Sequence, residues 1–149
     1  MNELLEIDNN TGEILLPCEN EDDLKIIKQT KIKALHLLSP NDFVKINGVW
    51  EAKRDALIKI LSSLPISYTW SIKQKELNKE YAQVLGTLSV ITGSITRKTD
   101  SMGICEFTEL KGNGGLHFMN ARAETRALKR AIETLFGSVI NFYVGRYLN

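Results

Sequence analysis

The sequence predicts an α+β fold in which an antiparallel three-stranded β-meander packs on helices, with a β-β-β-α core. Helical spacing of apolar residues dominates before Pro65, an alternation with a period of two follows it, and a last helical stretch comes after the glycine-rich loop KGNGG. We expect two regions: an acidic hairpin and helix over residues 1–40, and the β-β-β-α domain over residues 41–149.

The first 65 residues predict a hairpin and two helices. LLEIDNNTGEILL, residues 4–16, predicts a short hairpin around the turn-forming NNTG. An acidic start then leads into a helix that ends before Pro40. After a brief turn at Asn47-Gly48, a second helix is predicted from about Glu51 to Leu64. Its apolar residues recur at spacings of three and four and predict one buried stripe, Ala56, Leu57, Ile60, Leu61 and Leu64.

Three strands are predicted after Pro65. In ISYTWSIKQK, apolar and polar residues alternate, which predicts a strand that buries Ile66, Tyr68, Trp70 and Ile72 on one face. Residues 81–98 are rich in β-branched and small residues and predict the second strand. We expect TDSMG, residues 99–103, to form a turn and ICEFTEL, residues 104–110, to form the third strand.

The last helix is predicted from about Phe118 to Phe136, with Gly137 ending it. At about 100° per residue, one stripe should face the sheet: Phe118, Ala121, Thr125, Leu128, Ile132 and Leu135. A neighbouring arc about 100° wide carries four cations, Arg122, Arg126, Lys129 and Arg130, with Glu133 among them. A third stripe of Ala123, Ala127 and Ala131 suits close packing against another subunit.

Charge is divided unevenly along the chain. Residues 1–50 carry 5 lysines and no arginine against 9 acids, whereas residues 51–149 carry 14 lysines and arginines against 9 acids. A basic surface that binds a polyanion is therefore expected in residues 51–149. A solvated helix face is the plainer interpretation of the cation arc, but arginine suits bidentate phosphate contact, and KGNGG would let a phosphate chain come close.

Several classes of site are not supported by the sequence. Its 2 cysteines and 2 histidines are isolated from one another, so we expect no metal and no cofactor. No GxxxxGK[ST] motif occurs, which argues against a nucleotide-binding P-loop. No apolar run is long enough to cross a bilayer, and MNELLEIDNN lacks the blocks of an export signal. We expect a protein of the cytoplasm, in a bacterial or phage-infected cell, with no membrane partner.

The element order, together with TRALKRAIETLFG, resembles the Rad fifty-two superfamily of single-strand annealing proteins. That superfamily includes the eukaryotic recombination mediator, DdrA-like bacterial DNA-damage proteins and annealing recombinases of phages. Its helix pattern is matched here by Thr125, Leu128, Lys129, Arg130, Ala131 and Gly137. NGVWEAKRDALIKIL is similar to the family's segment leading into the first helix, and ISYTWSI is similar to the strand that follows. The resemblance spans roughly residues 43–142.

The resemblance implies subunits that assemble into a homo-oligomeric ring, with single-stranded DNA in an outer basic groove. Lys129 and Arg130 match the paired cations of the groove helix, and Lys53 or Arg54 matches a cation at the base of the first helix. The next groove cation falls at Glu133, an acid here. We also expect a single-strand-binding protein or an exonuclease as a partner.

The expected function is that of a single-stranded DNA-binding protein, not an enzyme. It would promote ATP-independent annealing of complementary strands in homologous recombination and DNA repair. Such a protein holds the phosphate chain and leaves base edges free, so it needs charge that is independent of base sequence. The candidate phosphate contacts are Lys53, Arg54, Lys73, Lys75, Arg97, Lys98, Lys111, Arg122, Arg126, Lys129 and Arg130.

Alternative interpretations remain open from the sequence. A double-stranded RNA-binding module also runs α-β-β-β-α. A small nuclease would need carboxylates gathered around a metal, and Asp55, Asp100, Glu106 and Glu109 form no such motif. A purely structural oligomer would keep the ring without the DNA. Tyr68 and Trp70 could stack bases, although their alternation places them on the apolar side of a strand.

Overall fold

A computed structural model of the protein describes residues 6–7, 14–15, 21–112 and 114–149. The chain forms two compact units. The first comprises Met1–Ile66, Thr92–Ile95 and Phe136–Asn149, and the second comprises Ser67–Ile91 and Thr96–Leu135. Among the described residues, no helix combines the length and the apolar character that crossing a membrane requires.

The first unit contains short strand pairs and helices. In chain order its complete elements are β1 (Glu6–Ile7), β2 (Ile14–Leu15), α1 (Glu21–Leu37), η1 (Pro40–Asp42), β3 (Phe43–Ile46), β4 (Val49–Ala52), α2 (Arg54–Ser63) and the terminal π-helical turn η3 (Val144–Leu148). Strands β1 and β2 pair antiparallel, as the predicted hairpin requires, and the NNTG turn lies outside the described residues. The predicted first helix is confirmed by α1.

Strands β3 and β4 form a hairpin around Asn47-Gly48. Both turn residues have positive φ, 51° and 81°, which the Asn-Gly pair adopts readily in a two-residue hairpin turn. Because β4 continues to Ala52, helix α2 begins at Arg54 and not at Glu51 as predicted. The predicted apolar stripe of α2 is confirmed, since all five of its residues are buried.

Two contacts link the hairpin base to neighbouring elements of the first unit. The rings of Phe43 and Tyr143 stack with centroids 5.2 Å apart. Asp42 accepts hydrogen bonds from Lys59 Nζ at 2.8 Å and from the backbone N–H of Ser39 at 2.8 Å. Burial raises the pKa of Asp42, but these hydrogen bonds, the positive charge of Lys59 and a further hydrogen bond from the Ser39 hydroxyl together more than offset it, so the pKa lies below its usual value.

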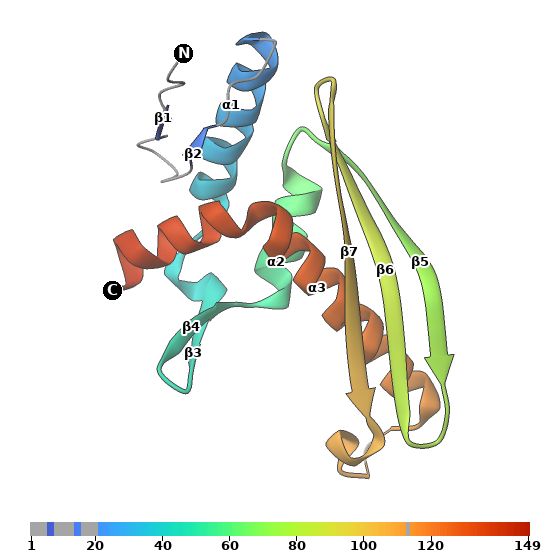
Figure 1. Ribbon diagram of the computed structural model, residues 1–149. Helices are drawn as coiled ribbons and strands as arrows, with labels where there is room; N and C mark the ends of the chain where they lie inside the picture. Colours follow the sequence, from blue (N-terminus) through green and yellow to red (C-terminus); the bar gives the residue numbers. More distant parts are fainter. Residues whose placement is uncertain (1–5, 8–13, 16–20, 113) are drawn as a thin grey trace. The chain divides into compact units, whose positions relative to one another are not determined.

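The second unit is built on a three-stranded antiparallel sheet packed against a helix (Figure 1). Its strands follow chain order: β5 (Ser67–Leu77), β6 (Tyr81–Thr92) and β7 (Ile95–Glu106). The predicted meander is therefore confirmed, but the prediction of a turn at TDSMG was wrong. The turn falls at Gly93, which has φ +61°, and residues 99–103 lie inside β7. The expected third strand ends early, because residues 107–110 form the 3-10 helix η2 (Phe107–Leu110).

Helix α3 (Leu116–Tyr143) is longer than predicted and passes through Gly137. A glycine inside a helix costs about 1 kcal/mol relative to alanine. Beyond Gly137, however, the helix buries Val139, Ile140 and Tyr143. Each fully buried apolar side chain of this size stabilises by about 1.5–3 kcal/mol, so burial outweighs the glycine.

Helix α3 packs on the sheet through its alanines, and the prediction that Phe118 and Ala121 face the sheet was wrong. Ala123, Ala127 and Ala131 are fully buried, whereas Phe118 is 54% exposed. Gly103 explains the choice: a Cβ there would lie 2.5 Å from the backbone N of Ala127 and closer still to the carbonyl oxygen of Ala123. Small residues on both sides thus let the helix backbone lie directly on β7.

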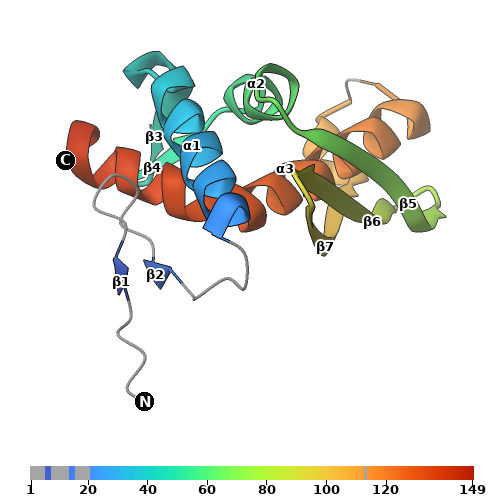
Figure 2. The same ribbon diagram turned by 90° about the horizontal axis from the view of Figure 1, so that it is seen from above.

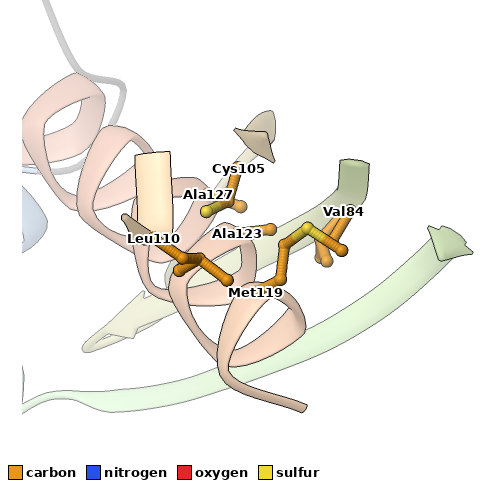
Figure 3. Packing of buried hydrophobic residues seen from close by; sticks show 7 residues of the cluster. Val84, Cys105, Leu110, Met119, Ala123 and Ala127 are labelled. Carbon is orange, nitrogen blue, oxygen red and sulfur yellow. The ribbon is translucent and has the colours of Figure 1, made fainter. Parts of the chain in front are cut away.

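The core of the second unit lies between α3 and one face of the sheet (Figure 3). It consists of Ala82, Val84, Cys105, Leu110, Met119, Ala123 and Ala127. Ser101 on β7 also donates its hydroxyl to the carbonyl of Ala127. Within this unit, α3 runs along one side of the three strands (Figure 2). The strand residues that alternate with the buried ones, and so project to the opposite face, are mostly polar.

The predicted buried face of β5 is only partly buried. Trp70 packs against the core, and its indole covers Gly86, where a Cβ would collide with the ring. Tyr68 and Ile72 are 48% and 39% exposed. Because β5 is the edge strand away from β7, only its centre lies close enough to the core to be covered.

Candidate nucleic-acid interface

Four cations of α3 lie along one side of the helix, next to its buried alanines. At about 100° per residue, Arg122, Arg126, Lys129 and Arg130 fall within an arc of about 100°. We call these four residues the cation arc. Arg126 and Arg130 both reach backbone carbonyls of β7, so the arc lies along the side of α3 that borders this edge strand.

Arg126 is held by its own chain. Its Nη1 donates to the carbonyl of Ile104 at 2.6 Å and to Oε2 of Glu109 at 2.8 Å. The same Glu109 oxygen accepts the backbone N–H of Glu106 at 2.9 Å. The hydrogen bonds from Arg126 and Glu106 lower the pKa of Glu109 to about 2. The charge of Arg126 is therefore neutralised by the carboxylate of Glu109. This ion pair holds η2 against α3.

Arg130 is held by a neutral group. Its Nη1 donates to the carbonyl of Met102 at 3.2 Å, and no carboxylate of the described residues pairs with it. Edge strands present unpaired carbonyls that attract other strands, and a charged side chain placed on the edge reduces this tendency. Arg130 thus covers part of the β7 edge and keeps its positive charge.

The other two members of the cation arc are weakly held or free. Lys129 Nζ lies 3.9 Å from Glu133 Oε1, a contact one turn along the helix and at the outer limit for an ion pair. Arg122 is half-buried and forms no hydrogen bond or ion pair with any described residue. Within the part of the chain that the structure describes, three of the four arc cations therefore lack a carboxylate at hydrogen-bonding distance.

The predicted contacts on the sheet are divided between its two faces. Lys73 and Lys98 lie on the face opposite α3, where Lys73 donates to Asp100 at 2.8 Å. Asp100 also accepts the hydroxyl of Thr87 at 2.5 Å, and the hydrogen bond from Lys73 is the main reason that its pKa lies below the usual value. Lys75, paired with Val84 in register, lies on the α3 side of β5. The sheet lysines therefore do not continue the cation arc.

The remaining predicted contacts are separate from the arc. Arg97 is half-buried on the α3 side of β7. Lys111, at φ 50°, ends η2. Lys53 and Arg54 belong to the first unit, at the start of α2, where Lys53 Nζ donates to the carbonyl of Asn41 at 2.7 Å.

The sequence did not reveal the partners of the arc cations. Glu109 lies 17 residues before Arg126, and the accepting carbonyls of Met102 and Ile104 lie 28 and 22 residues before their arginines. No local spacing signals such contacts, because they depend on how α3 is placed on β7. The described residues contain no group of three or more histidines, cysteines or acids able to hold a metal ion.

Comparison with known proteins adds no assignment. No protein-family model matches the chain, and no curated protein matches its sequence.

Proposed function

We propose that the protein binds single-stranded DNA through the cation arc and promotes the annealing of complementary strands without ATP. The observation that carries the proposal is the alignment of Arg122, Lys129 and Arg130 on one rigid helix, each without a carboxylate of the described residues at hydrogen-bonding distance. Such a row attracts a polyanion and does not read base sequence. The observed order α2-β5-β6-β7-α3 is also the order that the likeness to single-strand annealing proteins requires.

The proposal assigns unequal roles to the predicted contacts. Lys129 and Arg130 contact phosphates, with Arg122 extending the row about two turns toward the helix start. Arg126 positions η2 through Glu109 and contributes little charge to the strand. Arginine and lysine contacts to phosphate leave the base edges free, which is the condition for two bound strands to find each other.

A titration of a dye-labelled thymidine oligonucleotide by fluorescence anisotropy tests the proposal. The double variant Lys129→Ala, Arg130→Ala removes two phosphate contacts, so we expect weaker binding and a salt dependence that is shallower by about 1.4 in log–log slope, at about 0.7 per contact. Lys25→Ala, Lys33→Ala is the matched control, because both lysines are exposed on α1. Equal slopes for the Lys129/Arg130 double variant and wild type would contradict the assigned contacts.

Annealing is measured separately, by quenching between complementary labelled oligonucleotides with no nucleotide present. We expect the double variant to anneal more slowly than wild type and the control variant. A duplex RNA competitor is included in the anisotropy experiment. Displacement of the oligonucleotide by duplex RNA in preference to unlabelled single-stranded DNA would favour the double-stranded RNA-binding alternative.

We propose further that subunits assemble into a ring through the β5 edge. The alanine stripe cannot serve as the interface, since it is buried against its own sheet. Carbonyls of β7 are occupied by Arg126 and Arg130, whereas β5 is an 11-residue edge strand whose residues are exposed except at Trp70. Ser71→Pro removes a backbone N–H from β5 and should weaken the pairing of this edge with a strand of another subunit. Light scattering of wild type at micromolar concentration is expected to give an oligomer, and a monomer would refute the ring.

A further inference from the structure

Arg97 differs from the arc cations in its setting. It lies on β7, four residues before Ser101, whose hydroxyl reaches the carbonyl of Ala127 on α3. Since alternate residues of a strand project to the same face, Arg97 also projects to the α3 side of the sheet. Its neighbour Lys98 projects to the opposite face and is exposed.

The guanidinium of Arg97 is half-buried and has no partner among the described residues. It forms no ion pair and no hydrogen bond with any described residue. Burial alone lowers its pKa, with no carboxylate to act in the other direction. A guanidinium nevertheless remains charged in proteins and offers five N–H donors. Partial removal of such a charge from water without a counter-ion destabilises the folded chain.

Two acids on or beside β7, Asp100 and Glu109, already have cationic partners other than Arg97. Asp100 accepts from Lys73 and Thr87, and Glu109 accepts from Arg126. Because Arg97 pairs with no acid of the described residues, a counter-anion for it would come from outside the described part of the chain. The planar fork of arginine matches two oxygens of a phosphate or phosphodiester bidentately, which a lysine ammonium does not.

We propose that Arg97 is an anchoring site for a single phosphate group, distinct from the cation arc. Where the protein binds single-stranded DNA as proposed above, the anchored group is one phosphodiester of the strand; that identification rests on the proposed function, whereas the anion site itself does not. The folded protein keeps the unpaired charge of Arg97, at a cost in stability, because a bound phosphate supplies the counter-charge.

Thermal unfolding in phosphate and in chloride at equal ionic strength tests the site. In chloride, we expect Arg97→Met to unfold at the same temperature as wild type or higher, because the unpaired charge is gone. Phosphate should raise the midpoint of wild type and of the control Lys98→Met by clearly more than it raises that of Arg97→Met, which keeps only the general stabilisation by phosphate and the contribution of the cation arc. At a phosphate concentration ten times the Kd, the unfolding equilibrium constant of wild type should fall about 11-fold. An equal phosphate shift in Arg97→Met, or no shift in wild type, would overturn the proposal.

Arg97→Lys provides a second variant that keeps the charge and loses the planar fork. Calorimetric titration with inorganic phosphate should give a weaker affinity for Arg97→Lys than for wild type, and equal affinities would overturn the proposal even if Arg97→Met failed to fold. Thymidylyl-thymidine, which carries one phosphodiester, is titrated in parallel. Binding of inorganic phosphate but not of the diester would assign the site to free phosphate.

The site and the proposed function can fail independently. If wild type binds phosphate through Arg97 but binds no oligonucleotide, the single-stranded DNA proposal fails and the anion site stands. If the oligonucleotide binds through the cation arc while phosphate stabilises Arg97→Met as much as wild type, the anion site fails and the DNA proposal stands.

Discussion

Gly103→Ala tests the close approach of α3 to β7, on which the placement of the cation arc depends. A Cβ at this position would lie 2.5 Å from the backbone N of Ala127 and 3.0 Å from Cβ of Arg126, with the carbonyl oxygen of Ala123 nearer still. None of these atoms can rotate away, because each belongs to the helix backbone or to its first side-chain carbon. Gly103 has no positive φ, so the expected effect arises from contact and not from backbone strain.

The loss of folding stability in Gly103→Ala follows from the contacts that an outward shift of α3 would weaken. Overpacking in a well-packed core costs about 1–3 kcal/mol. Moving the helix outward also weakens three hydrogen bonds to it, from Ser101 to Ala127 and from Arg126 and Arg130 to β7. Each is worth about 0.5–1.5 kcal/mol net. Against this, alanine in a strand gains about 0.5–1 kcal/mol over glycine. We expect destabilisation of about 2–5 kcal/mol, a fall in Tm of about 4–20 °C at about 2–4 °C per kcal/mol.

Urea and thermal unfolding followed by circular dichroism measure the effect. Gly137→Ala is the matched control, because it lies inside the same helix with nothing within 4 Å of an added Cβ. Replacing a helical glycine with alanine should stabilise by about 1 kcal/mol. If Gly103→Ala unfolded at the wild-type midpoint while Gly137→Ala behaved as expected, the direct packing of α3 on β7 would be refuted.

Three further predictions concern the second unit. Gly86→Ala should destabilise less than Gly103→Ala, because the colliding group is the outer end of the Trp70 indole, and a red shift in tryptophan emission should report the displaced ring. Glu109→Gln should lower stability by at most about 1 kcal/mol at neutral pH, as expected of an exposed pair. Because the folded pKa of Glu109 is lowered to about 2, its contribution is complete above the unfolded pKa of about 4.3 and is lost as pH falls toward 2, so wild type and variant should converge there in urea unfolding. Arg126→Ala should reduce stability more than oligonucleotide affinity, and Arg122→Ala the reverse, with unfolding and anisotropy measured on the same preparations.

Much of the architecture could be predicted because it depends on local periodicity. The spacing in α2 identified all five of its buried residues, and the alternation after Pro65 located β5. Turn positions were harder. Gly93 and the stretch TDSMG both suit turns, and only pairing with β6 decides that the chain reverses at Gly93. The end of α3 was equally non-local, because burial of residues beyond Gly137 outweighs the glycine.

The face that α3 buries could not be predicted from hydrophobicity alone. Phe118 is more apolar than Ala123, yet Phe118 is exposed and Ala123 is buried. The choice depends on distance: a strand with Gly103 at the contact accepts a helix backbone directly, and a phenylalanine would hold the two apart. Gly103 was assigned to a turn in the sequence, so its role as the complement of the alanines was not visible. The cation arc itself was predicted correctly in sequence spacing, but not its pairing.

The partners of the arc cations decide which of them a single strand of DNA could contact under the proposed function. Arg130 donates to a neutral carbonyl and keeps its charge, so a phosphate can approach it without displacing a carboxylate. For Arg126 to reach a phosphate, it must release Glu109, and the freed carboxylate would then repel the strand beside it. The exchange also gives up the hydrogen bond to Ile104, worth about 0.5–1.5 kcal/mol, so a phosphate contact there gains little. A bound DNA strand is therefore expected to contact Arg122, Lys129 and Arg130, while Arg126 stays paired with Glu109.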